Sequence, residues 1–402
     1  MVLQRDGYRG QAVLNFGLDD VAYLTSQAGA AALEVVADFP LTSRVTEVAA
    51  LRERFGTRTP ALVETVLLRR RAATKLAELS GTADWLFTDE ALQQASAASV
   101  ALHRARRLAG GLPDGVVHDV TCSIGTELAA LRDLAVRVVG SDVDPVRLAM
   151  AQHNLGGNAD LCRADALRPV TRDTTIVVDP GRRSAGRRRF DPRDYQPALD
   201  HLLSVYRDRR LVVKCAPGID FDQIRRLGFD GEIEVTSDRG SVREACLWSA
   251  ALAEPGVRRR ASILDRHEQI TDADPDDCPV RPAGRWILDP DGAVVRAGLV
   301  RHYAARHKLW QLDPHIAYLS GDQLPPGLRG FEVLDQVNFD EKRLRQALTA
   351  ADCGSLEVLV RGADVDPDAL RRRLRLSGRE SLTVVIARLG AGATAFVCRP
   401  SR

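Results

Sequence analysis

Apolar residues recur every three or four positions along the first part of the chain. This spacing occurs in residues 19–39 and again in 59–79, and it predicts helices that bury one apolar face. An alanine-rich stretch over 89–109 predicts a further long helix, because two glycines and Pro113 follow it as stop signals. The N-terminal part of the chain is therefore expected to be helical.

From residue 116 onward, short apolar runs alternate with helical segments. Such alternation predicts a parallel, doubly wound α/β sheet. The last two runs are joined by residues 237–241, too few for a parallel crossover, so they are expected to form an antiparallel hairpin. A seven-stranded Rossmann-like sheet that ends in one antiparallel pair is typical of methyltransferases, whereas a dehydrogenase sheet normally stays parallel. The predicted strands lie near 116–120, 136–141, 159–163, 175–179, 210–215, 231–236 and 242–249.

The pattern divides the chain into four expected parts. After residue 331 the predicted order of elements is β-α-β-α-β-β, which suggests a small ferredoxin-like α+β domain. Residues 254–284 are rich in Pro, Asp and Arg and are expected to be a linker or a covering segment, and a new unit with a short strand at 286–288 is expected to begin at about Trp286. The expected parts are a helical N-terminal region (1–88), a Rossmann-like domain (89–253), a linker or irregular segment (254–330) and an α+β domain (331–402).

Composition changes this picture little. The chain has 402 residues, of which 45% are hydrophobic and 27% charged, as in ordinary soluble proteins of two or three domains. No apolar run approaches the roughly 20 residues of a membrane span. The first residues also lack the apolar core of a signal peptide. We therefore expect a cytoplasmic protein that makes no contact with a membrane.

Net charge and cysteine content give little evidence for a nucleic-acid partner, a disulfide or a metal site. The net charge of +2 does not by itself indicate a nucleic-acid partner. All but four of the basic residues are arginine, a bias that a GC-rich genome would produce. The seven cysteines are scattered without a C-x-x-C pair, and the histidines offer no ligand spacing. Buried, reduced thiols and no bound metal are expected.

The strongest chemical signal lies in residues 116–145. A buried run ends in Asp119 and passes through a turn of small residues into a helix, and about 20 residues later a second apolar run ends in Asp142. This arrangement indicates a nucleotide-binding crossover, in which Asp142, or alternatively Asp144, accepts the ribose hydroxyls. The turn lacks G-x-G-x-x-G, so no pyrophosphate site is expected. The pattern predicts S-adenosyl-L-methionine as the cofactor and methyl transfer as the reaction.

Further residues complete the predicted cofactor site. Asp119, Cys122, Ser123 and Gly125 are expected to form the loop beside the methionine half of the ligand, where glycine permits close approach of the backbone and the following helix favours the ligand carboxylate. Glu127 is a candidate for the ligand ammonium, or it complements the helix dipole. Asp165 follows the third strand, where a carboxylate can contact the adenine amino group.

The fourth predicted strand ends in Asp179-Pro180. A carboxylate and the adjacent carbonyl can accept hydrogen bonds there from a nitrogen about to be methylated, which orients its lone pair toward the methyl group. Lys214 ends a buried run near the same sheet edge and is either substrate-binding or a paired structural lysine. Phe190 and Tyr195 either stack on a base or belong to the core. The loop after the acid is predicted to contact phosphate groups, unless codon bias explains its arginines, through Arg182, Arg183, Arg187, Arg188 and Arg189.

Several stretches carry a family resemblance, among them HDVTCSIGTEL (118–128), VDPGRRSAGRRRFDPRDY (178–195), VVKCAPGID (212–220) and LEVLVRGADVDPDALRRRLRL (356–376). Together they resemble a bacterial family of class I S-adenosylmethionine-dependent methyltransferases with a THUMP-like C-terminal domain. The resemblance covers nearly the whole chain. It implies a helical N-terminal region, a Rossmann-like catalytic domain and a THUMP-like tail. Because THUMP domains are associated with RNA modification, it also implies RNA as the substrate.

One departure from a related pattern limits the acceptor. Methyltransferases of base amino groups typically carry an acid or Asn, then Pro-Pro and an aromatic residue, whereas this chain has Asp179-Pro180-Gly181-Arg182. This difference disfavours exocyclic amines and leaves ring nitrogens, ribose and acceptors outside nucleic acids open.

Three other functions are alternatives to RNA methylation. The enzyme could methylate a protein or a small molecule, or the chain could be a non-catalytic RNA-binding protein that retains a cofactor fold. An NAD-dependent oxidoreductase is disfavoured by the absent glycine motif and by the terminal hairpin. The sequence does not specify the oligomeric state or the acceptor atom.

Overall fold

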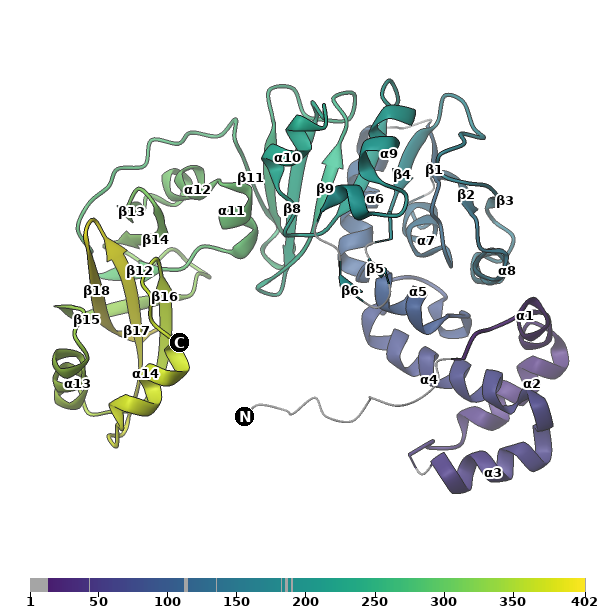
Figure 1. Ribbon diagram of the computed structural model, residues 1–402, viewed down its shortest axis with the longest axis horizontal. Coiled ribbons are helices and arrows are strands. Elements are labelled where there is room, and N and C mark those ends of the chain that lie inside the picture. Colours follow the sequence, from purple (N-terminus) through teal and green to yellow (C-terminus); the bar gives the residue numbers. More distant parts are fainter. Residues whose placement is uncertain are drawn as a thin grey trace. The chain divides into compact units, whose positions relative to one another are not determined.

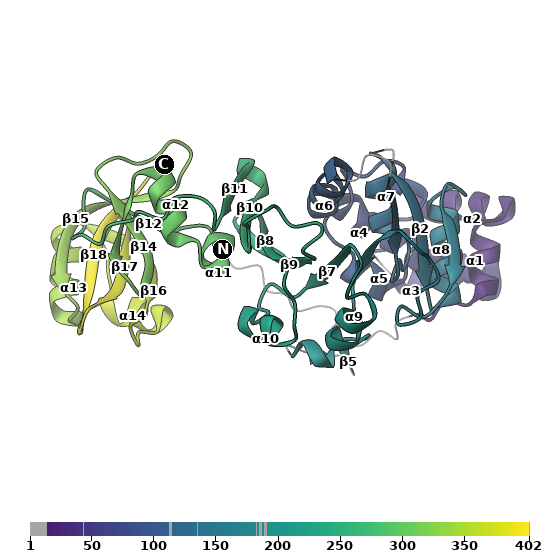
Figure 2. The same cartoon turned by 90° about the horizontal axis from the view of Figure 1, so that it is seen from above.

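The computed structural model describes residues 14–42, 44–111, 115–134, 136–181, 183–184, 187–188 and 191–401. The chain divides into two compact units. The first comprises Met1–Gly231 and Glu244–Ala253, and the second comprises Glu232–Arg243 and Glu254–Arg402. Figures 1 and 2 show the elements of each unit in two views.

The N-terminal part of the first unit is helical, as predicted. The helices pack on one another through apolar residues, of which Val36, Leu62 and Leu68 are fully buried. The spacing of three or four residues thus marks the faces that the helices bury. In the described residues this part contains α1 (Leu18–Leu24), α2 (Gln27–Ala37), α3 (Arg44–Phe55), η1 (Gly56–Arg58), α4 (Thr59–Lys75) and η2 (Thr82–Asp84).

The long helix predicted over 89–109 is wrong in one respect, because the structure has two helices there. They are α5 (Asp89–Gln94) and α6 (Ala98–Gly111). Ala95 leaves the helical conformation with a ψ of 139°. The break separates α5 from α6 and leaves residues 95–97 as a short bend between them.

A lysine from α4 explains the position of this break. Lys75 Nζ donates hydrogen bonds to the carbonyl oxygens of Leu92 at 2.7 Å and Gln93 at 3.1 Å. The last carbonyls of a helix lack partners within the helix, and the lysine supplies them. Alanine favours a continuous helix in this stretch, but the tertiary contact decides the outcome.

The first unit also contains a β-sheet. In the described residues it consists of β1 (Val116–Asp119), β2 (Arg137–Asp142), β3 (Asp160–Arg163), β4 (Thr175–Val178), β7 (Leu211–Cys215) and β9 (Ser241–Trp248). The strand order is β3-β2-β1-β4-β7-β9. The first five strands are parallel, and β9 is antiparallel to β7. The predicted doubly wound sheet with an antiparallel final strand is confirmed.

Helices cover both faces of this sheet. Figure 2 shows α6 and α7 (Thr126–Arg132) on one face, and α9 (Leu199–Val205) and α10 (Phe221–Arg226) on the other. Helix α8 (Pro145–Asn154) packs against β2 and β3. All residues of β4 and β7 are buried, which explains their uninterrupted apolar runs. The short helix η3 (Pro192–Asp194) precedes α9.

The stretch over 254–330 is not irregular, which corrects the prediction. Its strands are short, and β10 and β11 are also polar, so their pattern is weak. Arg260, for example, is 7% exposed in a buried strand because its Nε donates to Glu232 Oε1 at 2.7 Å. The elements are β10 (Arg259–Ile263), η4 (Leu264–Arg266), β11 (Glu268–Thr271), β12 (Trp286–Leu288), α11 (Gly292–Ala297), α12 (Val300–His307), β13 (Trp310–Asp313) and β14 (Ile316–Gly321).

Two of these strands, β10 and β11, form a sheet with β8 in the second unit. In the second unit β8 (Glu232–Asp238) pairs in parallel with β10, and β10 pairs in antiparallel with β11. Arg239 and Gly240, both with positive φ, form the turn from β8 to β9. The second unit therefore contains two strands, β10 and β11, beyond the seven that the sequence predicts for the Rossmann-like domain.

The C-terminal part of the second unit has the predicted order of elements. Its sheet has the strand order β13-β14-β12-β15-β18-β17-β16. Side chains of β17 point alternately to the two faces of this sheet: Val384 and Ile386 pack toward the helices, and Val385 and Ala387 pack on the other face. Strands β16 and β17 are parallel. Figure 1 shows α13 and α14 beside this sheet. The elements are β15 (Gly330–Asn338), α13 (Glu341–Ala350), β16 (Cys353–Arg361), α14 (Pro367–Leu374), β17 (Glu380–Leu389) and β18 (Gly392–Pro400).

Candidate active site

A cavity of about 460 Å³ lies in the first unit where β1, β2, β3 and β4 end. Parallel strands place their carboxyl ends at one edge of the sheet, so the residues that follow them converge. Among the described residues, Gly125 and Pro180 are predicted site residues that do not line the cavity. The predicted site residues that do line it are Asp119, Cys122, Ser123, Glu127, Asp142, Asp165, Asp179 and Lys214.

The turn after β1 depends on left-handed backbone conformations. Ser123 has a φ of 49° and Gly125 a φ of 90°. A Cβ atom at Gly125 would lie 3.0 Å from Leu155 Cδ1, so backbone and packing both favour glycine. Asn154 of α8 fixes the turn from behind, because its Nδ2 donates to the carbonyl of Ile124 at 3.0 Å.

Asp119 ends β1 and is 2% exposed. Its Oδ1 accepts hydrogen bonds from the Thr121 backbone N–H at 3.0 Å and from Thr121 Oγ1 at 3.4 Å. Burial, with a smaller effect of the Glu127 charge, raises the pKa of Asp119 to about 7. Thr121 Oγ1 also accepts from the backbone N–H of Asp179 at 2.7 Å. The threonine therefore joins the ends of β1 and β4.

Asp142 and Asp144 have different roles. Asp142 Oδ2 accepts from the Ser123 N–H at 3.0 Å, and its Oδ1 accepts from the Asp144 N–H at 2.9 Å. Each oxygen keeps a second lone pair at the cavity wall. Asp144 is the N-cap of α8, where its Oδ1 accepts from the N–H groups of Val146 and Arg147 at 2.8 and 3.2 Å. The geometry favours Asp142 over Asp144 as a ligand-binding acid.

Two other predicted residues line the cavity differently. Asp165 is exposed after β3, and its Oδ1 accepts from the Leu167 N–H at 2.9 Å. Cys122 is 3% exposed, and burial raises the pKa of its thiol well above the ordinary value. Cys122 thus contributes a neutral wall, whereas Asp165 presents a solvated carboxylate.

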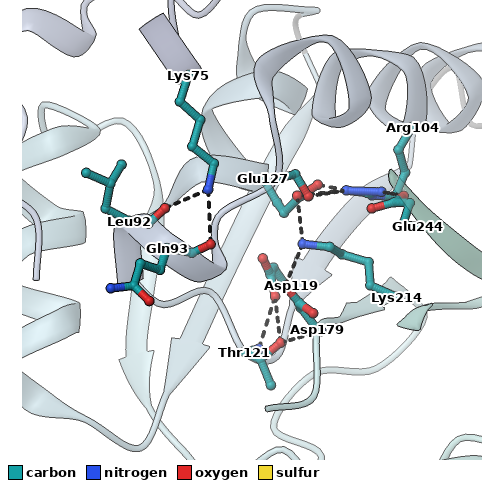
Figure 3. A network of polar contacts seen from close by, with 11 residues as sticks. Lys75, Leu92, Gln93, Arg104, Asp119, Thr121, Glu127, Asp179, Lys214 and Glu244 are labelled. Carbon is teal, nitrogen blue, oxygen red and sulfur yellow. Dashed lines mark hydrogen bonds and ion pairs between the residues drawn. The ribbon is translucent and has the colours of Figure 1, made fainter. Parts of the chain in front are cut away.

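Lys214 of β7 links two carboxylates at the back of the cavity (Figure 3). Its Nζ lies 2.5 Å from Asp179 Oδ2 and 3.2 Å from Glu127 Oε1. Burial opposes the charge of this ammonium, but Asp179 and Glu127 raise the pKa of Lys214 above its ordinary value. The lysine therefore remains a cation and cannot serve as a base near neutral pH.

Glu127 has its strongest partner on α6. Arg104 donates from Nε to Glu127 Oε2 at 3.1 Å and from Nη2 to Glu127 Oε1 at 2.8 Å. Burial raises the pKa of Glu127, but Arg104 and Lys214 outweigh it and hold this pKa at about 2. Arg104 also pairs with Glu244 of β9. The sequence predicts that Glu127 belongs to the cofactor site, and the structure adds two cationic partners for it.

The N-terminal helices contribute a wall of the cavity that the sequence does not predict. Glu90 and Gln94 of α5 and Ser96 in the bend that follows it line the cavity. Arg147 Nη2 of α8 donates to Glu90 Oε2 at 2.7 Å. Asn154 Oδ1 accepts from the backbone N–H of Leu86, which ties the same region to α8. No local motif marks these residues, since their position depends on the break between α5 and α6.

Thr126 was also missed. It is 6% exposed and lines the cavity at the start of α7. Its Oγ1 is a buried side-chain oxygen without a hydrogen-bond partner among the described residues. An unpaired buried hydroxyl is costly, and a bound ligand would supply its partner. The small polar residue after Gly125 was the available signal.

The acceptor side is described in part. Arg182, Arg189 and Phe190 lie outside the described residues, and the backbones of Arg183, Arg187 and Arg188 lie in the ribbon of β5 (Arg183–Ser184) and β6 (Arg187–Arg188).

The start and end of that loop lie together. Gly181 and Gln196 exchange two backbone hydrogen bonds of 2.7 and 2.9 Å. Tyr195 is 2% exposed, and its hydroxyl accepts from the Ala216 N–H, so it belongs to the core and does not stack on a base.

Two negative findings apply to the residues that the structure describes. They contain no group of three or more His, Cys, Asp or Glu side chains able to hold a metal ion. Within them there is also no helix of the length and apolar character needed to cross a membrane.

Two proteins from strains of Mycobacterium tuberculosis match this chain closely. Each carries the name of an uncharacterized S-adenosylmethionine-dependent methyltransferase and is 71% identical over 362 residues, which is 88% of this chain and 100% of the relative. This chain belongs to the S-adenosylmethionine-dependent methyltransferases. The predicted cofactor and the predicted class of enzyme are confirmed.

A solved structure and two family models extend this result. A candidate methyltransferase from Porphyromonas gingivalis superposes with a TM-score of 0.72 at 16% identity, covering 97% of this chain and 100% of that one, which supports the fold of the methyltransferase. Residues 328–400 match the model described as THUMP domain-like, and residues 17–72 match a domain of unknown function (DUF8688). The predicted THUMP-like C-terminal domain is confirmed.

Proposed function

We propose that this methyltransferase acts on RNA. The observation that carries the proposal is the THUMP-like domain over residues 328–400, which lies on the same chain as the catalytic domain. The family resemblance associates such domains with RNA modification. The neighbouring helices α13 and α14 of this domain support the proposal, because they carry exposed cations suited to phosphate groups at Lys342, Arg343, Arg345, Arg371, Arg372 and Arg373.

We propose that the cofactor binds in the cavity at the ends of β1 to β3. Asp142 would accept the ribose hydroxyls with its remaining lone pairs, and Asp165 would accept from the adenine amino group. Asp119 and the turn of Cys122, Ser123 and Gly125 would surround the methionine half. The orphaned hydroxyl of Thr126 supports this fit, since a ligand carboxylate would accept its hydrogen bond.

The acceptor is proposed to bind beside Asp179. S-adenosylmethionine supplies, when bound, a methyl group on a sulfonium that is already a good leaving group. Asp179 and the carbonyl of Pro180 would accept hydrogen bonds from the acceptor and orient it, while Lys214 holds Asp179 in place. The Arg182–Arg189 loop would contact phosphates of the same RNA. The absence of a Pro-Pro-aromatic pattern after Asp179 favours a ring nitrogen or a ribose hydroxyl over an exocyclic amine as the acceptor.

The test is transfer of a labelled methyl group. Purified enzyme would be incubated with tritiated S-adenosylmethionine and with RNA or protein from cells that lack the gene. We expect label that is lost on ribonuclease treatment and is absent with an Asp179→Asn variant. The matched control is Asp208→Asn, at an exposed aspartate of the same domain. Label that resists ribonuclease but is lost on protease treatment would instead assign the enzyme to protein methylation.

A second measurement would identify the acceptor atom. Nucleosides from the labelled RNA would be separated and identified by mass spectrometry. A methyl group on a ring nitrogen or on ribose is expected. A methyl group on an exocyclic amine would contradict the inference drawn from Asp179-Pro180-Gly181-Arg182. The cytoplasmic location remains part of this proposal, because the enzyme would meet its RNA there.

A further inference from the structure

Arg104 is a buried cation that the proposed reaction does not use directly. It lies on α6 and is 2% exposed. Four elements meet at its guanidinium, because its partners are Glu127 of α7, Glu244 of β9 and Ser96 in the bend after α5. Burying a cation costs several kcal/mol of desolvation free energy, and its ion pairs and hydrogen bonds have to offset that cost. Its retention inside the fold therefore needs an explanation.

Arg104 and Lys214 compete for the same carboxylate. Arg104 occupies both oxygens of Glu127, at 3.1 Å and 2.8 Å. Lys214 makes a longer contact of 3.2 Å with Glu127 Oε1, which Arg104 already shares. Its shorter contact, 2.5 Å, is with Asp179 Oδ2. The guanidinium thus supplies most of the charge that compensates Glu127, and the shorter contact of the ammonium is with Asp179 (Figure 3).

Glu244 and Ser96 keep Arg104 in this position. Glu244 Oε1 pairs with Arg104 Nη1, and Ser96 Oγ accepts from Nη2 at 3.2 Å. Glu244 is 7% exposed, so it is a permanent part of the fold and not a surface partner. The planar fork of arginine can satisfy two carboxylates at once, which a lysine ammonium cannot do in the same plane.

We propose that Arg104 is a positioning residue for methyl transfer, which acts through Glu127 and Lys214 to hold the Asp179 carboxylate at the acceptor side of the cavity. This inference rests on the proposed role of Asp179. Without Arg104, Glu127 would carry an uncompensated buried charge and would draw Lys214 toward itself. Asp179 would then lose the partner that fixes its orientation.

The first test is structural and needs no substrate. Crystal structures of the wild-type enzyme and of an Arg104→Met variant would be compared. We expect the Lys214 ammonium to move from Asp179 to Glu127 in the variant. An unchanged contact between Lys214 and Asp179 would overturn the proposal. Arg104→Lys, which keeps the charge but loses the fork, and Glu244→Gln serve the same comparison if Arg104→Met does not fold.

The second test separates positioning from stability. We expect Arg104→Lys to lower kcat by about tenfold or more while the Kd of S-adenosylhomocysteine, measured by calorimetry, stays within about threefold. Arg106→Lys is the control, because Arg106 is exposed on the same helix. An unchanged kcat would contradict the proposal, and so would a parallel loss of kcat and of ligand affinity.

A double-mutant cycle tests whether Arg104 acts through Lys214. If it does, adding Arg104→Lys to Lys214→Met should lower kcat little further than Lys214→Met does. Additive losses would mean that Arg104 acts on its own, which would overturn the proposal. Failure of the proposed RNA substrate would appear separately, as a wild-type enzyme that labels no RNA, and the structural test would still decide the role of Arg104.

Discussion

Thr121 Oγ1 accepts a hydrogen bond of 2.7 Å from the backbone N–H of Asp179. The same hydroxyl lies 3.4 Å from Asp119 Oδ1. One threonine therefore connects the acid at the end of β1, on the proposed cofactor side, with the acid at the end of β4, on the proposed acceptor side. This connection, and the acids that it joins, can be tested one by one.

Thr121→Val removes the hydroxyl and keeps the shape of the side chain. It leaves the Asp179 N–H without its acceptor, a loss of about 1 kcal/mol for a part-buried hydrogen bond. We expect a lower kcat together with a lower unfolding temperature. Thr121→Ser retains the hydroxyl and should restore most of both. Equal activity in the valine and serine variants would show that the hydrogen bond does not position Asp179.

Asp179→Ala tests the division between the two sides of the cavity. We expect methyl transfer to RNA to fall below detection, because the acceptor loses the group that orients it. The Kd of S-adenosylhomocysteine, measured by calorimetry, should change by no more than a few-fold, about fivefold at most, since cofactor affinity depends on other contacts. Equal losses of activity and of affinity would mean that Asp179 belongs to the cofactor site.

Asp142 and Asp144 form a matched pair two residues apart. Asp142→Ala is expected to weaken S-adenosylhomocysteine binding by about tenfold or more, because a hydrogen bond to a charged group contributes roughly 1.5–3 kcal/mol. Asp144→Ala removes the N-cap of α8 and should cost about 1 kcal/mol of stability with little effect on affinity. Calorimetric titration and thermal unfolding of both variants measure the two effects. The opposite pattern would assign the ribose to Asp144.

Asp119 makes folding stability depend on pH. Its pKa is raised to about 7 by burial, from an ordinary value of 3.8. The folded protein therefore keeps this proton over a range in which the unfolded chain releases it. The stabilisation is complete below about pH 4 and is lost as the pH rises through 7.

The Asp119→Asn side chain cannot ionise, so the variant should not lose folding stability through this group as the pH rises. Without ligand, the variant is expected to gain stability relative to the wild type as the pH rises from 5 to 8, by more than about 1 kcal/mol. Urea unfolding at the two pH values measures this difference. Asp208→Asn, at an exposed position, is the control and should follow the wild type. A constant difference between Asp119→Asn and the wild type would contradict the raised pKa.

The two basic segments can be compared through the salt dependence of RNA binding. Replacement of Arg187–Arg189 by alanine should weaken binding most at low salt, and each lost phosphate contact should reduce the slope of log K against log salt by about 0.7. The triple variant Lys342→Ala, Arg343→Ala and Arg372→Ala tests the THUMP-like domain in the same way. Arg52→Ala, on exposed α3, is the control. An unchanged slope would assign the corresponding arginines to codon bias.

The sequence predicts those parts of the fold that local patterns determine. Strands β1, β2, β4 and β7 are recognisable because each is an apolar run, and parallel pairing then brings Asp119, Asp142 and Asp179 to one edge of the sheet. The acids at the cavity were therefore accessible from sequence. Short polar strands such as β10 were not, because the buried pairing of Arg260 with Glu232 hides their pattern.

Long-range partners set the limit of prediction at the site. Arg104 lies 140 residues from Glu244 and 23 from Glu127, and no motif joins them. The bend that brings Ser96 to the cavity depends on Lys75, which lies on another helix. Burial lowers the pKa of that lysine to about 8, a further sign of a tertiary role that composition does not reveal. These side-chain contacts join residues that are distant in the sequence, so only the folded structure reveals them.

Asn154 carries a consequence for how this enzyme can be divided. Its amide exchanges hydrogen bonds of 2.7 and 3.0 Å with the backbone of Leu86 and donates a third, of 3.0 Å, to Ile124 in the turn after β1. One side chain thus fastens the N-terminal helices to the turn at the cavity. Severing the chain near residue 88 would remove two of the three partners of that amide and release the turn. A fragment that begins after residue 88 is therefore expected to lose the geometry of this turn, and with it methyl transfer, along with the helices.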